Sequence, residues 1–209
     1  MHRWIEVWFQ WVHDWGYLGV TLLMAIESSI FPLPSEIVIP PAAYWAKQGR
    51  FSLAGVVLAG TLGSWIGASV TYWVARWVGR PLLVRFGKYV FVPEHKLLLA
   101  ERWLARYEAG GVFFARLVPV VRHLIGIPAG LVRMPYRMFS LMTVTGAGLW
   151  CWVLAWFGGR ILGDRPDLLE NPNALVDVLH HRTGEVGLFA LLLCALYIFV
   201  LRATSKPRP

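Results

Sequence analysis

The feature that most constrains this chain is a polar stretch with two prolines inside an otherwise apolar sequence. Residues 27–36 read Glu-Ser-Ser-Ile-Phe-Pro-Leu-Pro-Ser-Glu, with apolar residues on both sides. The apolar limb after it, about ten residues, would form about 15 Å of helix, half the hydrocarbon thickness of a bilayer. A broken backbone at membrane depth is tolerated only where protein or a wet cavity satisfies it. The pattern therefore predicts a re-entrant hairpin over about 17–46, with Pro32 and Pro34 at its tip.

The composition favours a small polytopic membrane protein over a soluble domain. Of the 209 residues, 57% are hydrophobic and only 15% are charged, and the mean hydropathy is +0.54. The net charge of +8 does not point to nucleic acid, because the basic residues cluster beside apolar segments, where lipid headgroups and orientation signals place them. Cys151 and Cys194 lie inside apolar runs and are expected to pack there. With no zinc-binding spacing, we expect neither a metal nor a cofactor.

The amino-terminal residues 1–15 have the pattern of an interfacial helix. Tryptophans recur there at helical spacing, and polar residues occupy the rest of the turn. A signal peptide is the alternative, but Glu6 and Asp14 interrupt the apolar core that it would need.

Two later runs, over about 52–75 and 138–158, are long enough to span a bilayer as helices. Both are rich in glycine, alanine and serine, which let helices approach closely. Residues 186–202 form a shorter apolar segment, which predicts a carboxyl-terminal transmembrane helix.

Residues 112–132 form an apolar run that a straight span does not explain. They contain Arg116, Pro119, Arg122 and Pro128. Two central arginines would cost a spanning helix roughly 5 to 7 kcal/mol, and each proline breaks the helical ladder. We expect a second re-entrant hairpin, with Pro119 near its tip.

A predicted re-entrant hairpin followed by a predicted spanning helix thus occurs twice along the chain, which indicates an internal repeat. Residues 76–110 carry seven Lys or Arg against three Glu, whereas 160–185 carry five acids against three Arg. The positive-inside rule places 76–110 and the tail after Arg202 in the cytoplasm and 160–185 outside. The hairpins then enter from opposite sides. The expected fold is an all-α membrane protein with an inverted-topology repeat, in which transporters hold their substrate site near the midplane.

The charges divide between the hairpins. The first carries Glu27 and Glu36 and the second carries Arg116 and Arg122, so the two would neutralise each other if they faced. Arginine's planar fork suits a phosphate or carboxylate, and buried membrane charges are usually functional. We therefore predict substrate binding by the arginines and a counter-ion or proton-carrying role for the glutamates.

Structural roles are the alternatives. The arginines could brace the carboxylates and carbonyls of the opposite hairpin without any ligand. Glu36 could complement the helix dipole in the first turn of a helix that Ser35 caps. His123 could relay protons or simply pack.

At these residues the chain resembles the bacterial DedA family, whose core is called the VTT or SNARE-associated domain. The resemblance covers residues 16–158 and rests on four motifs: Glu27 through Pro32-Leu-Pro34-Ser-Glu36; Gly63 and Gly67 with Tyr72; Phe114-Ala-Arg116-Leu-Val-Pro119-Val-Val-Arg122; and Pro128-Ala-Gly130 with Met134.

The resemblance implies a multi-pass inner-membrane protein with two facing hairpins. It also implies lipid translocation, in some members return of undecaprenyl phosphate, dependence on the proton-motive force, and functional roles at Glu27, Glu36, Arg116 and Arg122. The chain departs from many members at Ala68, where they have an acid, and at Ala42-Ala43, where they have Ala-Gly. Both departures bear on proton coupling.

The sequence therefore predicts a transporter or scramblase for lipids with phosphate headgroups, undecaprenyl phosphate or phospholipid. Its partners would be membrane lipids, and it could form a homo-oligomer. A lipid phosphatase with His123 as nucleophile is an alternative, but every Asp lies outside the apolar segments. A proton-coupled transporter of another small anion is a further alternative. A scaffold would be expected to carry large polar domains, which the sequence lacks. We expect no enzymatic activity.

Overall fold

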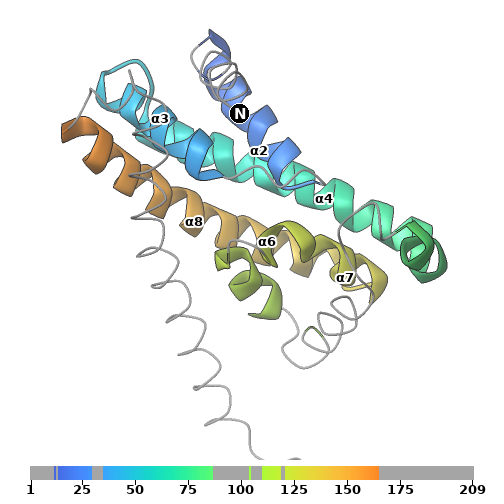
Figure 1. Ribbon diagram of the computed structural model, residues 1–209. Coiled ribbons are helices and arrows are strands. Elements are labelled where there is room, and N and C mark those ends of the chain that lie inside the picture. The colour runs from blue at the N-terminus through green and yellow to red at the C-terminus, as the bar shows by residue number, and fades with distance from the viewer. Residues whose placement is uncertain are drawn as a thin grey trace, which may run out of the picture.

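The computed structural model describes residues 12, 14–29, 35–86, 104, 110–118 and 121–164. Within these residues every regular element is a helix (Figure 1). The hairpin tips at Pro32, Pro34 and Pro119 lie outside the described residues, as do the segment 186–202 and nearly all of the predicted interfacial helix.

Two long helices run side by side through the molecule (Figure 1). Helix α4 spans Leu53–Phe86 and helix α8 spans Tyr136–Asp164. Their apolar stretches, Leu53–Gly79 with 27 residues and Tyr136–Arg160 with 25, are long enough to cross a membrane. The prediction of two long apolar helices in an all-helical chain is confirmed. Helix α4 breaks at Gly79, where a φ of 71° requires glycine.

Helix α4 exposes a continuous apolar surface and keeps several polar side chains buried. Exposed side chains form a stripe along α4 at a spacing of four residues: Leu58, Leu62, Ile66, Val70 and Val74. The buried face of the same helix carries Thr61, Ser64 and Thr71. A continuous exposed apolar stripe is unusual for a protein surrounded by water and fits a surface covered by lipid chains.

The first broken segment, residues 17–47, consists of two helices that are each too short to span a bilayer. Helix α2 (Tyr17–Glu27) has 11 residues and α3 (Ser35–Lys47) has 13, so they rise only about 17 and 20 Å. Helix α2 packs along α4 and α3 packs against α8. The contact between α2 and α4 depends on Gly63 and Gly67, because a Cβ on either would collide with a backbone carbonyl of α2.

The second broken segment, residues 110–131, is shorter still. Residues 110–117 are helical, and α6 (Val121–Leu124) and α7 (Gly126–Leu131) follow. Pro128 is buried in the first turn of α7, where proline is tolerated. Helix α7 packs against α4, and Gly146 of α8 packs against the backbone of residue 113. In both halves, one limb therefore contacts the long helix that follows it and the other contacts the long helix of the other half.

Candidate functional site

Three of the four charged residues predicted to be functional come together between α4 and α8. Glu27 is the last residue of α2, Arg116 lies in the helical stretch 110–117, and Arg122 lies in α6. They are only 1%, 3% and 5% exposed. Glu36 lies at the start of α3, and its side chain is outside the described part of the structure.

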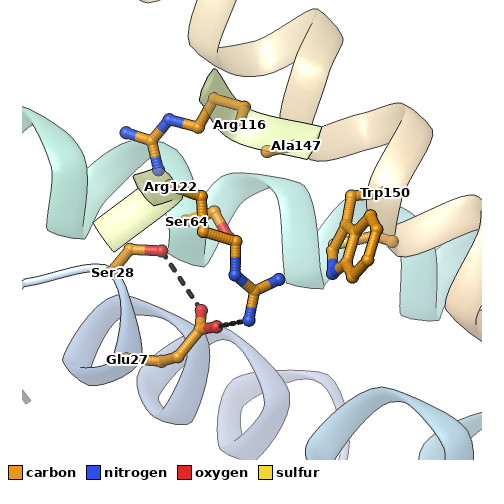
Figure 2. A pocket seen from close by; sticks show the side chains of 8 residues that line it. Glu27, Ser28, Ser64, Arg116, Arg122, Ala147 and Trp150 are labelled. Carbon is orange, nitrogen blue, oxygen red and sulfur yellow. Dashed lines mark hydrogen bonds and ion pairs between the residues drawn. The ribbon is translucent and has the colours of Figure 1, made fainter. Parts of the chain in front are cut away.

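Glu27 and Arg122 form a buried ion pair between the two broken segments. The Arg122 Nη2 donates to Glu27 Oε1, and the Ser28 hydroxyl donates to the other carboxylate oxygen at 3.2 Å (Figure 2). Removing one partner of such a pair would leave a buried, uncompensated charge, which is far more costly than the pair itself. The facing charges predicted from the sequence therefore do meet at these two residues.

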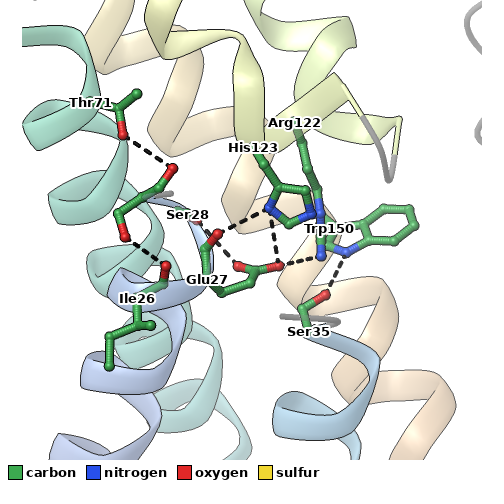
Figure 3. A network of polar contacts seen from close by, with 9 residues as sticks. Ile26, Glu27, Ser28, Ser35, Thr71, Arg122, His123 and Trp150 are labelled. Carbon is green, nitrogen blue, oxygen red and sulfur yellow. Dashed lines mark hydrogen bonds and ion pairs between the residues drawn. The ribbon is translucent and has the colours of Figure 1, made fainter. Parts of the chain in front are cut away.

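His123, the neighbour of Arg122, contacts the same glutamate through the backbone. Its Nδ1 lies 3.1 Å from the carbonyl oxygen of Glu27 and 3.9 Å from Oε1 of its carboxylate (Figure 3). A carbonyl oxygen only accepts hydrogen bonds, so this contact requires the proton on Nδ1. In neutral His123, Nε2 is then the nitrogen with the free lone pair. The contact ties the end of α2 to the second broken segment.

Arg122 lies over the ring of Trp150, a residue of α8. The Arg122 Cζ lies 5.3 Å from the centre of the Trp150 ring, within the range of a cation–π interaction. The indole Nε1 donates to the Ser35 hydroxyl at 3.2 Å, at the start of α3 (Figure 3). Both Trp150 and Ser35 are buried.

Arg116 differs from Arg122 in having no ion-pair partner within the described residues. Its Nε is buried and makes no hydrogen bond to the described part of the chain. In Figure 2 the dashed contacts join Ser28, Glu27 and Arg122, and none reaches Arg116. The Thr143 hydroxyl, one helical turn before Ala147 on α8, is also buried with no hydrogen bond there. Buried polar groups are nearly always satisfied, so such atoms are typical of places where a water or ligand binds.

A small cavity lies at the centre of this group. It is lined by Glu27, Ser28, Ser64, Arg116, Arg122, Ala147, Trp150 and Cys151, and it has room for about one water molecule. Two guanidinium groups face one carboxylate among these residues, which leaves an excess of positive charge suited to an anion. The described residues contain no cluster of three metal-ligand side chains.

The cavity lies near the middle of both long apolar stretches. Ser64 comes 11 residues after Leu53 and 15 before Gly79, and Ala147 comes 11 after Tyr136 and 13 before Arg160. Both are small residues, so the two long helices leave space at this level.

The VTT domain model matches residues 33–160, more than half of the chain. The chain belongs to the VTT domain family. This membership confirms the resemblance to the DedA family of membrane proteins that the motifs indicated. No solved structure matches the chain significantly.

Three curated relatives of this VTT domain protein align with it over at least 90% of its length. "Undecaprenyl phosphate transporter A" of Bacillus subtilis (strain 168) is 34% identical over 93% of both chains. "Uncharacterized membrane protein YkoX" of the same organism is 34% identical over 95% of this chain and 85% of the relative. An "Alkaline phosphatase-like protein" of Lactococcus lactis subsp. lactis (strain IL1403) is 31% identical over 90% of both chains.

Sequence reasoning missed the residues that complete the cavity. Trp150 gave no signal because it is one of 12 tryptophans, and Ser64, Ala147 and Cys151 read as ordinary residues of packed helices. Only their position on the inner faces of α4 and α8 distinguishes them.

Proposed function

We propose that this VTT domain protein moves lipids with a phosphate headgroup across the bacterial inner membrane, with undecaprenyl phosphate as the first candidate and phospholipids as the second. The observation that carries the proposal is Arg116, a buried arginine whose Nε has no hydrogen bond to the described chain, beside the Glu27–Arg122 pair. The printed name of the B. subtilis relative supports the first candidate.

The architecture we propose is an inverted repeat of two re-entrant hairpins, each followed by a spanning helix. Three observations support it. The two helices of the first broken segment are each too short to span a bilayer. In each broken segment one limb contacts α4 and the other contacts α8, and the charges of the two segments meet near the middle of both long apolar stretches. In this arrangement the cavity lies near the midplane of the membrane, where transporters of this kind hold their substrate.

In the proposed mechanism, the phosphate exchanges its water shell for the two guanidinium groups. Arg116 offers free donors first, and Arg122 then releases Glu27 to bind the phosphate through its fork. Because the cavity has room for about one water molecule, the hairpins must separate to admit a headgroup. Glu27, released from Arg122, would take up a proton, which couples transport to the proton-motive force. Glu36 shares the counter-ion role.

Reconstitution in lipid vesicles tests the proposal. Labelled undecaprenyl phosphate and labelled phospholipids are followed across the bilayer, with and without a pH gradient. We expect transport by the parent protein and loss of transport in Arg116→Lys and Arg122→Lys, because an ammonium keeps the charge but loses the two-point geometry. Full transport by both alanine variants, at normal yield and insertion, would remove the arginines from the mechanism.

A lipid phosphatase is the second candidate, favoured by the printed name of the L. lactis relative. His123 would be its nucleophile, with Nε2 as the nitrogen available for attack. Measuring inorganic phosphate in the same vesicles separates the two functions: a phosphatase releases phosphate from undecaprenyl phosphate, whereas a transporter moves it intact.

Including free labelled phosphate tests the remaining alternative, a proton-coupled carrier of a small anion.

A further inference from the structure

We infer that Trp150 is a positioning residue that keeps the Arg122 guanidinium correctly oriented while this arginine exchanges Glu27 for a phosphate, and that Ser35 holds the indole ring in place for this task. The inference rests on the proposed function and adds residues from two further elements, α8 and α3, to its machinery. Neither residue carries a charge, so their part in anion binding is indirect.

The position of Trp150 makes it a link between the broken segments. Its ring lies 5.3 Å from Arg122 Cζ, in the second broken segment, and its Nε1 donates at 3.2 Å to Ser35, in the first. The Trp150 side chain lines the cavity and is 3% exposed. A buried Trp Nε1 usually finds a hydrogen-bond partner, and here the partner fixes the plane of the ring.

Two contacts of Arg122, with Glu27 and with Trp150, use different parts of its guanidinium group. Glu27 accepts a hydrogen bond from Nη2, whereas Cζ of the same group lies over the Trp150 ring, which offers no hydrogen-bond acceptor of its own. Carboxylates and phosphates both bind the edge, where the N–H groups point. A phosphate can therefore replace Glu27 without disturbing Trp150. In this proposal the aromatic contact persists in both states and preserves the direction of the fork during the exchange.

A guanidinium without this support would have to be oriented by the incoming lipid itself. Such ordering lowers affinity, because part of the binding free energy is spent on fixing a long side chain. Loss of the indole should therefore raise the amount of lipid needed for half-maximal transport more than it lowers the maximal rate.

The experiment uses the full chain in vesicles with graded amounts of undecaprenyl phosphate. Trp150→Leu removes both contacts and should raise the half-saturating lipid content roughly tenfold, as expected for a desolvated cation–π pair. Trp150→Phe keeps a ring over Arg122 and should raise it about threefold. The matched control is Trp152→Leu, which removes a tryptophan from the same helix that is 53% exposed and faces outward. It should leave half-saturation unchanged.

Ser35→Ala tests the hydrogen bond without opening the core. Alone it should raise half-saturation by a factor similar to that of Trp150→Phe. Combined with Trp150→Phe it should add nothing, because the indole N–H is already absent. This non-additivity is not expected of general damage to packing, and it keeps the inference testable if Trp150→Leu fails to fold.

Two outcomes would overturn the inference while leaving the proposed function standing. One is an unchanged half-saturation in folded Trp150→Leu, and the other is full additivity of Ser35→Ala and Trp150→Phe. Failure of the parent protein to move undecaprenyl phosphate or phospholipid would instead overturn the proposed function.

Discussion

Two of the arginines that lie over aromatic rings in this molecule, Arg122 and Arg76, differ in what surrounds them. At the cavity, Arg122 lies over Trp150 and pairs with a buried carboxylate. Arg76 is half-buried and lies near the break in α4. Its Cζ lies 5.7 Å from the centre of the Trp73 ring, and its Nη1 donates to the Tyr72 hydroxyl at 2.8 Å. The partners of Arg76 are neutral.

The second site has the properties of a structural anchor. The Tyr72 hydroxyl donates to the carbonyl of Met134, just after α7, and the Tyr72 ring stacks on Phe139 at 4.8 Å. The Tyr72 hydroxyl therefore both accepts from Arg76 and donates to Met134. By contrast, the Nε of Arg116, which lines the cavity, has no hydrogen bond within the described chain, and neither has the Thr143 hydroxyl, one helical turn before the cavity residue Ala147. Buried polar groups without a partner are typical of places that bind a ligand, so we expect the Arg76 site to serve stability and the cavity to serve function.

The largest difference between the two arginine sites should appear when the Glu27 carboxylate is removed from the cavity. Glu27→Ala leaves Arg122 buried without its ion pair and should destabilise the protein by about 3 to 5 kcal/mol. Thermal unfolding in detergent measures the effect, with Glu27→Gln as a control that keeps the size and a hydrogen-bond acceptor. If the alanine variant unfolds at the parent's temperature, the carboxylate does not compensate Arg122.

The anchor should lose stability without losing lipid affinity. Tyr72→Phe removes the hydroxyl between Arg76 and the Met134 carbonyl and should cost about 1 to 1.5 kcal/mol, because two partly buried hydrogen bonds are lost. The half-saturating lipid content should not change. A shift in half-saturation at unchanged stability would reverse the roles assigned to the two sites.

Thr143→Val tests whether the unpartnered hydroxyl near the cavity costs stability. The substitution keeps the shape and removes a buried hydroxyl that has no described partner, so the protein should gain on the order of 1 kcal/mol in stability. Thr143→Ser, which keeps the hydroxyl, is the control. Destabilisation by valine would instead reveal that a bound water or lipid group satisfies this hydroxyl.

The smallest effect is expected at Arg76. Arg76→Gln removes its cation–π contacts at a partly exposed position and should cost about 0.5 to 1 kcal/mol. Arg76→Lys keeps the charge as a control, and thermal unfolding is again the measurement. A loss as large as that of Glu27→Ala would show that the two arginine sites are energetically alike.

The sequence predicted the charged part of the site and missed its neutral part. Glu27 and Arg122 could be paired because an apolar sequence leaves each charge few options. The same reasoning assigned Arg116 a carboxylate, whereas the described chain gives it none. Trp150 could not be chosen among 12 tryptophans, because the rotation of α8 decides which of them face inward. Close contacts fix that rotation, at Gly146 with the second broken segment and at Gly158 with Pro40 of α3.

The long helices were predictable and the short ones less so. The spans follow from length and apolarity alone. Helix α3 continues through Pro40 and Pro41, which the local sequence disfavours. Contacts with α8 support it there, and such contacts are tertiary information that no local pattern contains.

The Glu27–Arg122 pair also has a consequence for the synthesis of the chain. Its partners are 95 residues apart, so at about 5 to 20 residues per second the ribosome makes Glu27 roughly 5 to 20 s before Arg122. Through that interval the glutamate must wait at the membrane surface or enter the bilayer uncharged. The ionised, paired form of Glu27 therefore exists only once the second half of the protein has been made. The buried pair is completed by the second half, and the two halves mature as one unit.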